Sequence, residues 1–212
     1  MRNGRYHHGD LRRALLEAAA EAITESGVAT LSMRDLARRA GVSHAAPTNH
    51  FKDRAGLLTA LATDGFDQLA RALATSRLAS NSLLELGVTY LRFALANRAQ
   101  FEVMFRTDLY RADDPELLAA RRRAADALYA GMTDLPDAPL AGETVASPAR
   151  PAREGIAATV PDEVRDIGLA AWSMVHGFAT LWIGGAFPES ARAEDPVEAA
   201  RTILGRLLAL RG

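Results

Sequence analysis

The chain has 212 residues, of which 49% are hydrophobic and 24% are charged, and its formal net charge is −1. This length allows a sizeable core in one or two domains, and the absence of cysteine excludes disulfides and thiolate metal sites. Because no basic-then-apolar leader opens the chain, we expect a soluble protein of the cytoplasm.

Charge is unevenly distributed along the chain. Residues 1–56 carry nine Lys/Arg and six Asp/Glu, whereas the remainder carries 16 and 20. A basic end on an acidic body is typical of proteins that present one end to phosphates, although differences of this size also arise by chance in soluble proteins. The near-neutral total argues against non-specific compaction of DNA.

Residues 1–8 lack any apolar period and predict a flexible basic arm. His7 and His8 could suggest a metal site, but they lack the remaining ligands, so no metal is expected. After this arm, Leu, Leu, Ala and Ile recur every four residues and predict a helix over about 10–26, capped by Asp10 and stopped by Gly27.

Residues 32–51 predict a helix-turn-helix. Leu36 and Ala37 place the first helix on a core, and Gly41 can take the positive φ that ends it. Ser43 is expected to cap the second helix, as Ser32 with Asp35 caps the first. A proline at position 47 predicts that the second helix is short or locally distorted. Phe51 is expected to close a small core with Leu15, Leu36 and Val42.

Helical periodicity continues through the rest of the chain. Asp53 is expected to cap a helix over about 53–79, and Ser82 with Glu85 forms a capping box after a break at Asn81–Ser82. A further break is expected near Asn97–Arg98. Asp114 and Pro115 open a helix to about Met132, and Asp195 and Pro196 open the last one. The proline-rich stretch between them predicts a mobile loop over about 133–160.

Residues 167–187 contain no formal charge. A run of this length is the usual sign of a membrane span. Polar Ser173, His176 and Thr180, four glycines and the acidic flanks favour a helix buried on one face by its own subunit and on the other by a twin subunit. A membrane-associated or protein-interaction module that uses 167–187 remains the alternative reading.

The absence of strand-like alternation and of repeats predicts an all-α fold. No catalytic or phosphate-binding motif is present: there is no HExxH, no Gly-x-Ser-x-Gly and no phosphate loop. An enzyme built on a helical bundle is therefore not expected, and no cofactor is expected either.

The first 60 or so residues resemble the tetracycline-repressor (TetR) family of bacterial transcriptional regulators. The resemblance rests on the helix ending in Gly27, the Thr30–Leu31 bridge, the LARRAGVS turn, His50–Phe51 and the basic residue before Leu57–Leu58. The segment WSMVHG at 172–177 is similar to the W-x-x-V-H-G signature of one subgroup. The resemblance implies a three-helix head over 9–55, a helical ligand-binding and dimerisation domain over 56–212, and a homodimer formed by the last two long helices.

For this family, the resemblance implies a repressor that a small apolar or amphipathic molecule releases from a palindromic operator. Phosphate contacts are expected from Arg34, Thr48, His50, Lys52 and Arg54, and base contacts from Ser43, His44, Ala45, Ala46 and Asn49. Thr48 stands where the family usually has tyrosine, whose hydroxyl commonly contacts a DNA phosphate. Because threonine carries its hydroxyl on a far shorter stem, that contact could be lost or move to Asn49. A solvated helix face is the alternative reading for Arg34, and for Arg38 and Arg39 that reading is favoured over contact with DNA. His50 could instead pack beside Phe51.

Two further sets of residues follow from the same resemblance. The expected ligand-binding residues are Phe66, Tyr90, Phe93, Phe101, Met104, Phe105, Met132, Trp172 and His176. The expected dimer residues are Val175, Phe178, Ala179, Trp182, Leu204, Leu207 and Leu208. Such an aromatic and methionine stripe also suits a plain core, and His176 also suits a core histidine.

Overall fold

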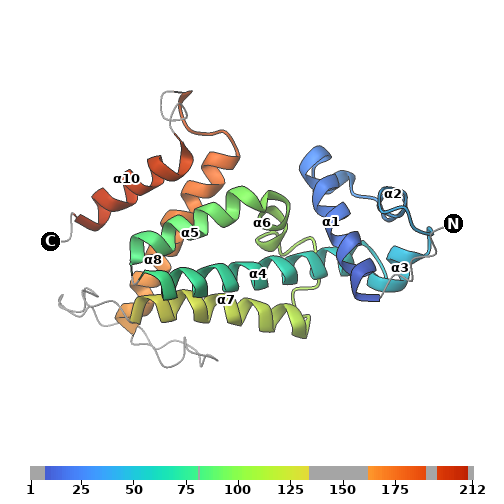
Figure 1. Ribbon diagram of the computed structural model, residues 1–212, viewed down its shortest axis with the longest axis horizontal. Coiled ribbons are helices and arrows are strands. Elements are labelled where there is room, and N and C mark those ends of the chain that lie inside the picture. The colour runs from blue at the N-terminus through green and yellow to red at the C-terminus, as the bar shows by residue number, and fades with distance from the viewer. Residues whose placement is uncertain (1–7, 81, 134–161, 190–194, 210–212) are drawn as a thin grey trace. The chain divides into compact units, whose positions relative to one another are not determined.

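The computed structural model describes residues 8–80, 82–133, 162–189 and 195–209, and every regular element in these ranges is helical (Figure 1). The elements are α1 (His8–Ser26), the 3₁₀ helix η1 (Val28–Thr30), α2 (Met33–Arg39), α3 (Ala46–Phe51), α4 (Arg54–Ala79), α5 (Leu83–Ala96), α6 (Arg98–Met104), α7 (Pro115–Thr133), α8 (Asp162–Ile183) and α10 (Pro196–Ala209). The all-α prediction is confirmed. The basic arm before residue 8 and the loop predicted over 133–160 lie outside the described residues, apart from Thr133.

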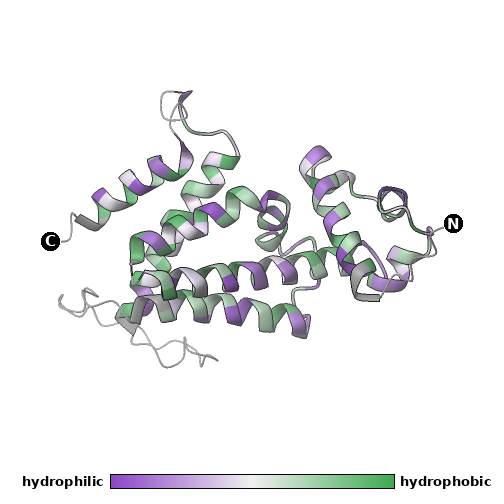
Figure 2. Cartoon of the chain, in the orientation of Figure 1, coloured by the Kyte–Doolittle hydropathy of each residue, from purple (hydrophilic) through white to green (hydrophobic). Residues whose placement is uncertain are grey.

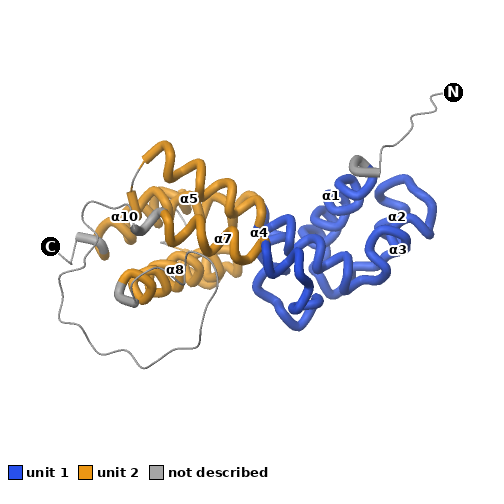
Figure 3. Tube along the Cα trace, turned by 90° about the horizontal axis from the view of Figure 1, so that it is seen from below, with its two compact units in different colours: residues 1–66, 97–119 blue, residues 67–96, 120–212 orange. Residues whose placement is uncertain are grey.

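The chain divides into two compact units (Figure 3). Unit 1 comprises residues 1–66 and 97–119, and unit 2 comprises 67–96 and 120–212. The division differs from the domain boundary predicted between residues 55 and 56. It falls inside α4, which is one continuous helix, and α6 belongs to unit 1 because it packs against α1.

The core of unit 1 gathers apolar side chains from α1, α2 and α4. Leu15, Leu36 and Phe51 are buried as expected, whereas Val42 is only half-buried. Gly27 ends α1 with φ +79°, and its N–H donates to the Ile23 carbonyl at 2.7 Å. Helix α1 is described from His8, so Asp10 lies within it and not before it, which corrects the predicted start of the helix.

Several helix starts follow the capping signals in the sequence. Asp53 Oδ1 accepts the Gly56 N–H at 2.8 Å, Asp114 Oδ1 accepts the Glu116 N–H at 3.0 Å, and Asp195 Oδ1 accepts the Val197 N–H at 2.9 Å. These carboxylates satisfy N–H groups that lack a helical acceptor. Figure 2 shows the alternation of hydrophobic and hydrophilic residues along α4 and α7 that the periodicity predicts.

The capping box before α5 forms only in half. The Ser82 hydroxyl accepts the Glu85 N–H at a long 3.4 Å, but the Glu85 carboxylate binds Arg201. This ion pair joins α5 to α10 within unit 2, where α5 also packs against α8. Glu85 therefore ties two helices together and does not close a capping box.

Helix α8 covers most of the uncharged run and ends at Ile183, before a turn in which Gly185 has φ +72°. Its side chains form two faces: Val175, Phe178, Ala179 and Trp182 are buried, whereas Leu169, Met174 and Leu181 are exposed. The chain itself covers only one face of α8, and a twin subunit on the other face stays a prediction. Among the described helices, none has the length and hydropathy of a bilayer span.

Candidate functional site

Helices α2 and α3 and the turn between them form the predicted helix-turn-helix. Gly41 has φ +65°, and the Val42 N–H donates to the Ala37 carbonyl at 3.0 Å. Leu36 and Ala37 are buried and hold α2 on the core of unit 1. The positive φ reverses the chain after α2, because a residue without Cβ adopts it at little cost.

Helix α3 begins two residues later than the sequence predicts, with Ala45 and not Ser43 before its first residue. Ser43 does not cap it: the Ser43 carbonyl accepts the Ala46 N–H at 3.0 Å in a turn, and Ala45 is the residue before the helix. Pro47 therefore lies in the first turn, where its missing N–H would have no helical acceptor in any case. The proline that suggested distortion instead suits the start of a helix six residues long.

The cap predicted at α2 also differs. Ser32 precedes α2 but makes no side-chain capping bond. Asp35 pairs with Arg38 at 2.5 Å and Arg39 at 2.8 Å, and Arg39 also pairs with Glu25 at 2.7 Å. Hydrogen bonds from Arg39 and then Arg38 lower the pKa of the Asp35 carboxyl below its usual range. This network supports the solvated-face reading of Arg38 and Arg39.

The outward surface of the helix-turn-helix is polar and small. Ser43, His44, Ala45, Thr48 and Asn49 are all exposed. Ala46 is the exception, because its side chain is buried on the core side of α3 together with Pro47 and Phe51. The base contact predicted at Ala46 is therefore wrong, and Ala45 is the alanine that faces outward.

The predicted phosphate-binding residues differ in how freely they are presented. Arg34 and Lys52 are exposed. His50 is half-buried, with its ring centroid 6.1 Å from that of Phe51, so both of its predicted roles stay open. Arg54 is also half-buried, and its Nη2 donates to the Val28 carbonyl at 2.6 Å. Arg54 therefore fastens α4 to η1, a structural role that the sequence did not indicate.

Lys52 occupies a strained backbone conformation between α3 and α4. Its φ is +67° and its ψ is −56°, and the Asp53 N–H donates to the Phe51 carbonyl at 2.8 Å. These dihedrals and this hydrogen bond define a γ-turn of the positive-φ kind, which is rare for a residue with a Cβ. Strain of this kind persists where the surroundings impose it, often at a functional site.

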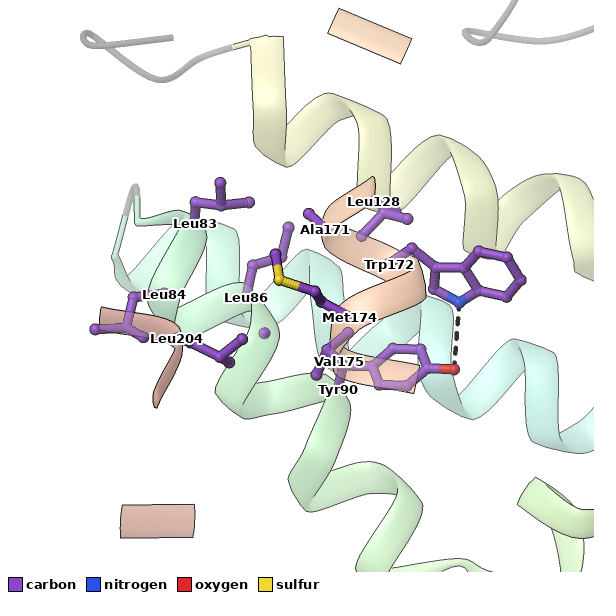
Figure 4. Close-up of a pocket in the computed structure, with 11 residues that line it drawn as sticks. Leu83, Leu84, Leu86, Tyr90, Leu128, Ala171, Trp172, Met174, Val175 and Leu204 are labelled. Atoms are coloured by element: carbon purple, nitrogen blue, oxygen red, sulfur yellow. Dashed lines mark hydrogen bonds between the residues drawn. The ribbon is translucent and has the colours of Figure 1, made fainter. Parts of the chain in front are cut away.

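Unit 2 contains an apolar cavity of about 40 Å³. Figure 4 shows Tyr90 and Trp172 at one end of it and aliphatic side chains around the rest. Its lining residues are Leu83, Leu84, Leu86, Gly87, Tyr90, Leu128, Ala171, Trp172, Met174, Val175 and Leu204. No charged side chain contributes to this wall, which therefore suits an apolar molecule.

A chain of hydrogen bonds lies at the polar end of the cavity. The Trp172 Nε1–H donates to the Tyr90 oxygen at 3.3 Å, and that oxygen lies 2.9 Å from His176 Nδ1. Burial lowers the pKa of His176 and raises that of Tyr90. The Tyr90 oxygen therefore accepts from the indole, which can only donate, and the tautomer of the imidazole sets the direction of the hydrogen bond between Tyr90 and His176.

The structure divides the predicted ligand-binding residues. Tyr90 and Trp172 line the cavity and His176 bonds to Tyr90, whereas Phe93 is buried but is not in the lining. Phe66, Phe101, Met104 and Phe105 belong to unit 1. There the Phe105 ring meets those of Phe66 and Phe101 edge-on at 5.8 and 5.3 Å. None of these four lines the cavity of unit 2, so their part in ligand binding stays a prediction. The Met132 side chain lies outside the described residues.

The sequence also missed the aliphatic part of the wall. Leu83, Leu86 and Tyr90 recur at helical spacing on α5, which is a signal for one apolar face but does not separate a cavity from a plain core.

The predicted dimer residues lie largely inside the subunit. Val175, Phe178, Ala179, Trp182 and Leu204 are buried, so they are not available to a partner and the prediction is wrong for them. Leu207 is exposed, and the Leu208 side chain lies outside the described residues. The large apolar side chains that α8 and α10 expose are Leu169, Met174, Leu181, Ile203 and Leu207. Because nearly every position of 167–183 is apolar or small, this part of the sequence does not reveal which face of α8 is inward.

Two family models match the chain. A model of bacterial regulatory proteins of the tetR family matches residues 15–61, and a model of a tetracyclin repressor-like C-terminal domain matches residues 83–207. The chain is also similar to the HTH-type transcriptional regulator BetI of Escherichia coli and Klebsiella pneumoniae, with 42% identity over 62 residues. That match spans 29% of this chain and about a third (32%) of the length of these curated relatives.

Solved structures resemble the chain over most of its length. A Rhodococcus sp. RHA1 protein of unknown function is 32% identical, with 95% of both chains covered and a TM-score of 0.69. The TetR family transcriptional regulator PfmR from Thermus thermophilus is 22% identical, with 89% of this chain and 93% of that chain covered and a TM-score of 0.62. At that identity the second likeness concerns the fold alone.

Proposed function

Because the chain belongs to the TetR family of bacterial regulatory proteins, we propose that it is a DNA-binding transcriptional regulator that a small molecule releases from its operator. The observation that carries the proposal is the surface of α3 and its preceding turn. His44, Thr48 and Asn49 are exposed there, with the Lys52 ammonium group at the end of the helix. A short helix with small and hydrogen-bonding side chains suits a DNA major groove.

At this surface, contacts with phosphates position the protein on DNA, and contacts with base edges give sequence specificity. The phosphates of the DNA backbone are contacted by Lys52, Thr48 and Arg34. Further donors come from His50 near the end of α3 and from Arg54 at the start of α4. His44 donates to a guanine N7 or O6, and Asn49 reads an adenine with two hydrogen bonds. The Ser43 hydroxyl hydrogen-bonds to a donor or an acceptor on a base edge, and the Ala45 methyl group contacts a thymine methyl.

A homodimer presents two such surfaces. The exposed apolar side chains of α8 and α10 support a partner surface there, since a monomer seldom leaves a row of large apolar residues in water. Two-fold symmetry then pairs two recognition helices and makes the operator palindromic. The interface residues of this proposal are Leu169, Met174, Leu181, Ile203 and Leu207.

The cavity of unit 2 is the proposed site of the small molecule. Its aliphatic wall favours an uncharged apolar or amphipathic compound, and the Tyr90 hydroxyl offers one polar contact. At about 40 Å³ the cavity holds few atoms, so a larger ligand must displace side chains on entry. Reciprocity requires DNA to weaken ligand binding by the factor by which ligand weakens DNA binding. Such a regulator acts in the cytoplasm and needs no catalytic activity.

Selection of bound duplexes from a random DNA pool tests the proposal. The expected result is one palindromic site, bound more tightly than bulk DNA by a factor of at least about 10³ at physiological salt. The variant Asn49→Ala should lose preference at one position of each half-site and keep the salt dependence of the wild type. Recovery of no common sequence by the wild type would contradict the proposal.

A further inference from the structure

The segment 97–119 belongs to unit 1, although the helix before it and most of the helix after it belong to unit 2. It contains α6 and the connection from α6 to α7. The middle of that connection is fastened to α4 through Arg111. The contacts of Arg111 therefore fasten this segment to the first part of α4 within unit 1.

Arg111 holds α4 at two points. Its Nη2 donates to Asp53 Oδ2 at 2.6 Å, and its backbone N–H donates to the Thr59 hydroxyl at 3.1 Å. Thr59 is buried, and its own hydroxyl donates to the Ala55 carbonyl at 2.7 Å. The side chain of Arg111 thus binds the residue before α4, and its backbone N–H binds the second turn of that helix.

Asp53 connects these contacts of Arg111 to the recognition helix. Its N–H donates to the carbonyl of Phe51, the last residue of α3, at 2.8 Å, and its Oδ1 accepts the Gly56 N–H at 2.8 Å. The Gly56 N–H and the Arg111 guanidinium hold the pKa of the Asp53 carboxyl below its usual range. Asp53 therefore remains a charged acceptor between α3, α4 and Arg111.

We propose that Arg111 is a positioning residue for the helix-turn-helix, and that its contact with Asp53 sets the orientation of α3 relative to the start of α4. The inference rests on the proposed function for its effect on DNA binding, because the orientation of α3 decides how its exposed side chains reach a DNA groove. Arg111 lies some 60 residues after the recognition helix in the sequence, so no motif of the helix-turn-helix includes it. It acts through Asp53 and not through a phosphate.

The experiment compares Arg111→Gln with Arg106→Gln in the full chain. Arg106 is a matched control because it pairs with Asp108, at 3.0 Å and with similar exposure, inside the same connection and without reaching α4. Arg111→Gln is expected to bind the selected operator about fivefold more weakly, the upper range for an exposed ion pair, with an unchanged salt slope. Hydrogen exchange of amides 46–60 should accelerate in Arg111→Gln and stay as in the wild type in Arg106→Gln.

A double-mutant cycle adds a readout that a general loss of stability does not produce. Asp53→Asn still caps α4 but removes the charge, so it should weaken operator binding as Arg111→Gln does. The double variant should be no weaker than either single variant. Arg111→Lys should recover part of the affinity, and it carries the test with Asp53→Asn if Arg111→Gln does not unfold cooperatively.

Two results would overturn the inference. A salt slope reduced by about one ion in Arg111→Gln would make Arg111 a direct phosphate contact. Equal affinity and equal exchange in Arg111→Gln and Arg106→Gln would leave it no positioning role. If the wild type binds no operator at all, the proposed function fails, whereas exchange at 46–60 still decides whether Arg111 sets the orientation of α3.

Discussion

The carbonyl oxygen of Phe51 lies against the Cα of Gly56, in the space that a Cβ on residue 56 would occupy. Arg111 Nη1 also stands 2.7 Å from that Cβ position. The last residue of the recognition helix thus approaches the first turn of α4 more closely than any residue with a side chain allows. This contact, and not a conformational need for positive φ, is what requires glycine at position 56.

Replacing Gly56 with alanine should therefore destabilise the protein, because the backbone of α3 has to move. We expect a loss of about 1–3 kcal/mol in the free energy of unfolding, measured with denaturant. Gly205→Ala is the control: no heavy atom outside its own helix lies within 4 Å of that Cβ, so helix propensity should make it stabilising by up to about 1 kcal/mol. A neutral Gly56→Ala would show that the junction yields easily.

The strain at Lys52 can be separated from its charge. Lys52→Ala removes the ammonium group but keeps a Cβ at φ +67°, whereas Lys52→Gly removes both. We expect Lys52→Gly to be more stable than Lys52→Ala by about 1 kcal/mol, the cost of a left-handed conformation. Both variants should lower the salt slope of DNA binding by about one ion. Equal stabilities would mean that the γ-turn relaxes in solution.

The exposed face of α8 gives a test of dimerisation. Leu181 is 50% exposed, and Leu181→Asp would place a carboxylate in the proposed interface, where an unpaired charge is costly. Sedimentation should then show a monomer. Leu78→Asp is the control, because Leu78 is 84% exposed on α4, away from the proposed interface residues in the sequence. A dimer that survives Leu181→Asp would place the interface elsewhere.

His176 predicts a dependence of stability on pH. Burial lowers its pKa below the ordinary 6.5, so the unfolded chain binds a proton at a pH where the folded protein does not. The contribution of neutral His176 is complete above pH 6.5 and is lost as the pH falls from there through the lowered pKa. In His176→Gln the free energy of unfolding should fall less steeply over this window than in the wild type. Parallel curves would mean that His176 titrates normally.

Local signals in the sequence predicted most of the helices. A capping carboxylate acts within three residues, so Asp53, Asp114 and Asp195 could be recognised without knowledge of the fold. Ser43 failed because Pro47 favours the first turn of a helix, and the two signals compete for the start of α3. The later signal prevailed, and Ala46 became the first residue of α3, with its side chain on the buried side of the helix.

Contacts between distant parts of the chain could not be predicted in the same way. The sequence predicts Arg54 as a phosphate ligand, and only the position of η1 shows that its guanidinium also binds the Val28 carbonyl. Arg111 carries no local pattern at all. The buried and exposed sides of α8 were equally obscure, because amphipathic contrast, the usual guide to the inward face, is almost absent from residues 167–187.

The hydrogen bond between Trp172 and Tyr90 gives the protein an optical reporter of its own. The chain has two tryptophans, and the other, Trp182, stacks on Phe178 with ring centroids 5.6 Å apart. In Trp182→Phe the remaining indole stands in the cavity wall, and its emission responds when a molecule displaces solvent or rotates the ring. Compound libraries can thus be screened by fluorescence alone, with neither a label nor knowledge of the operator.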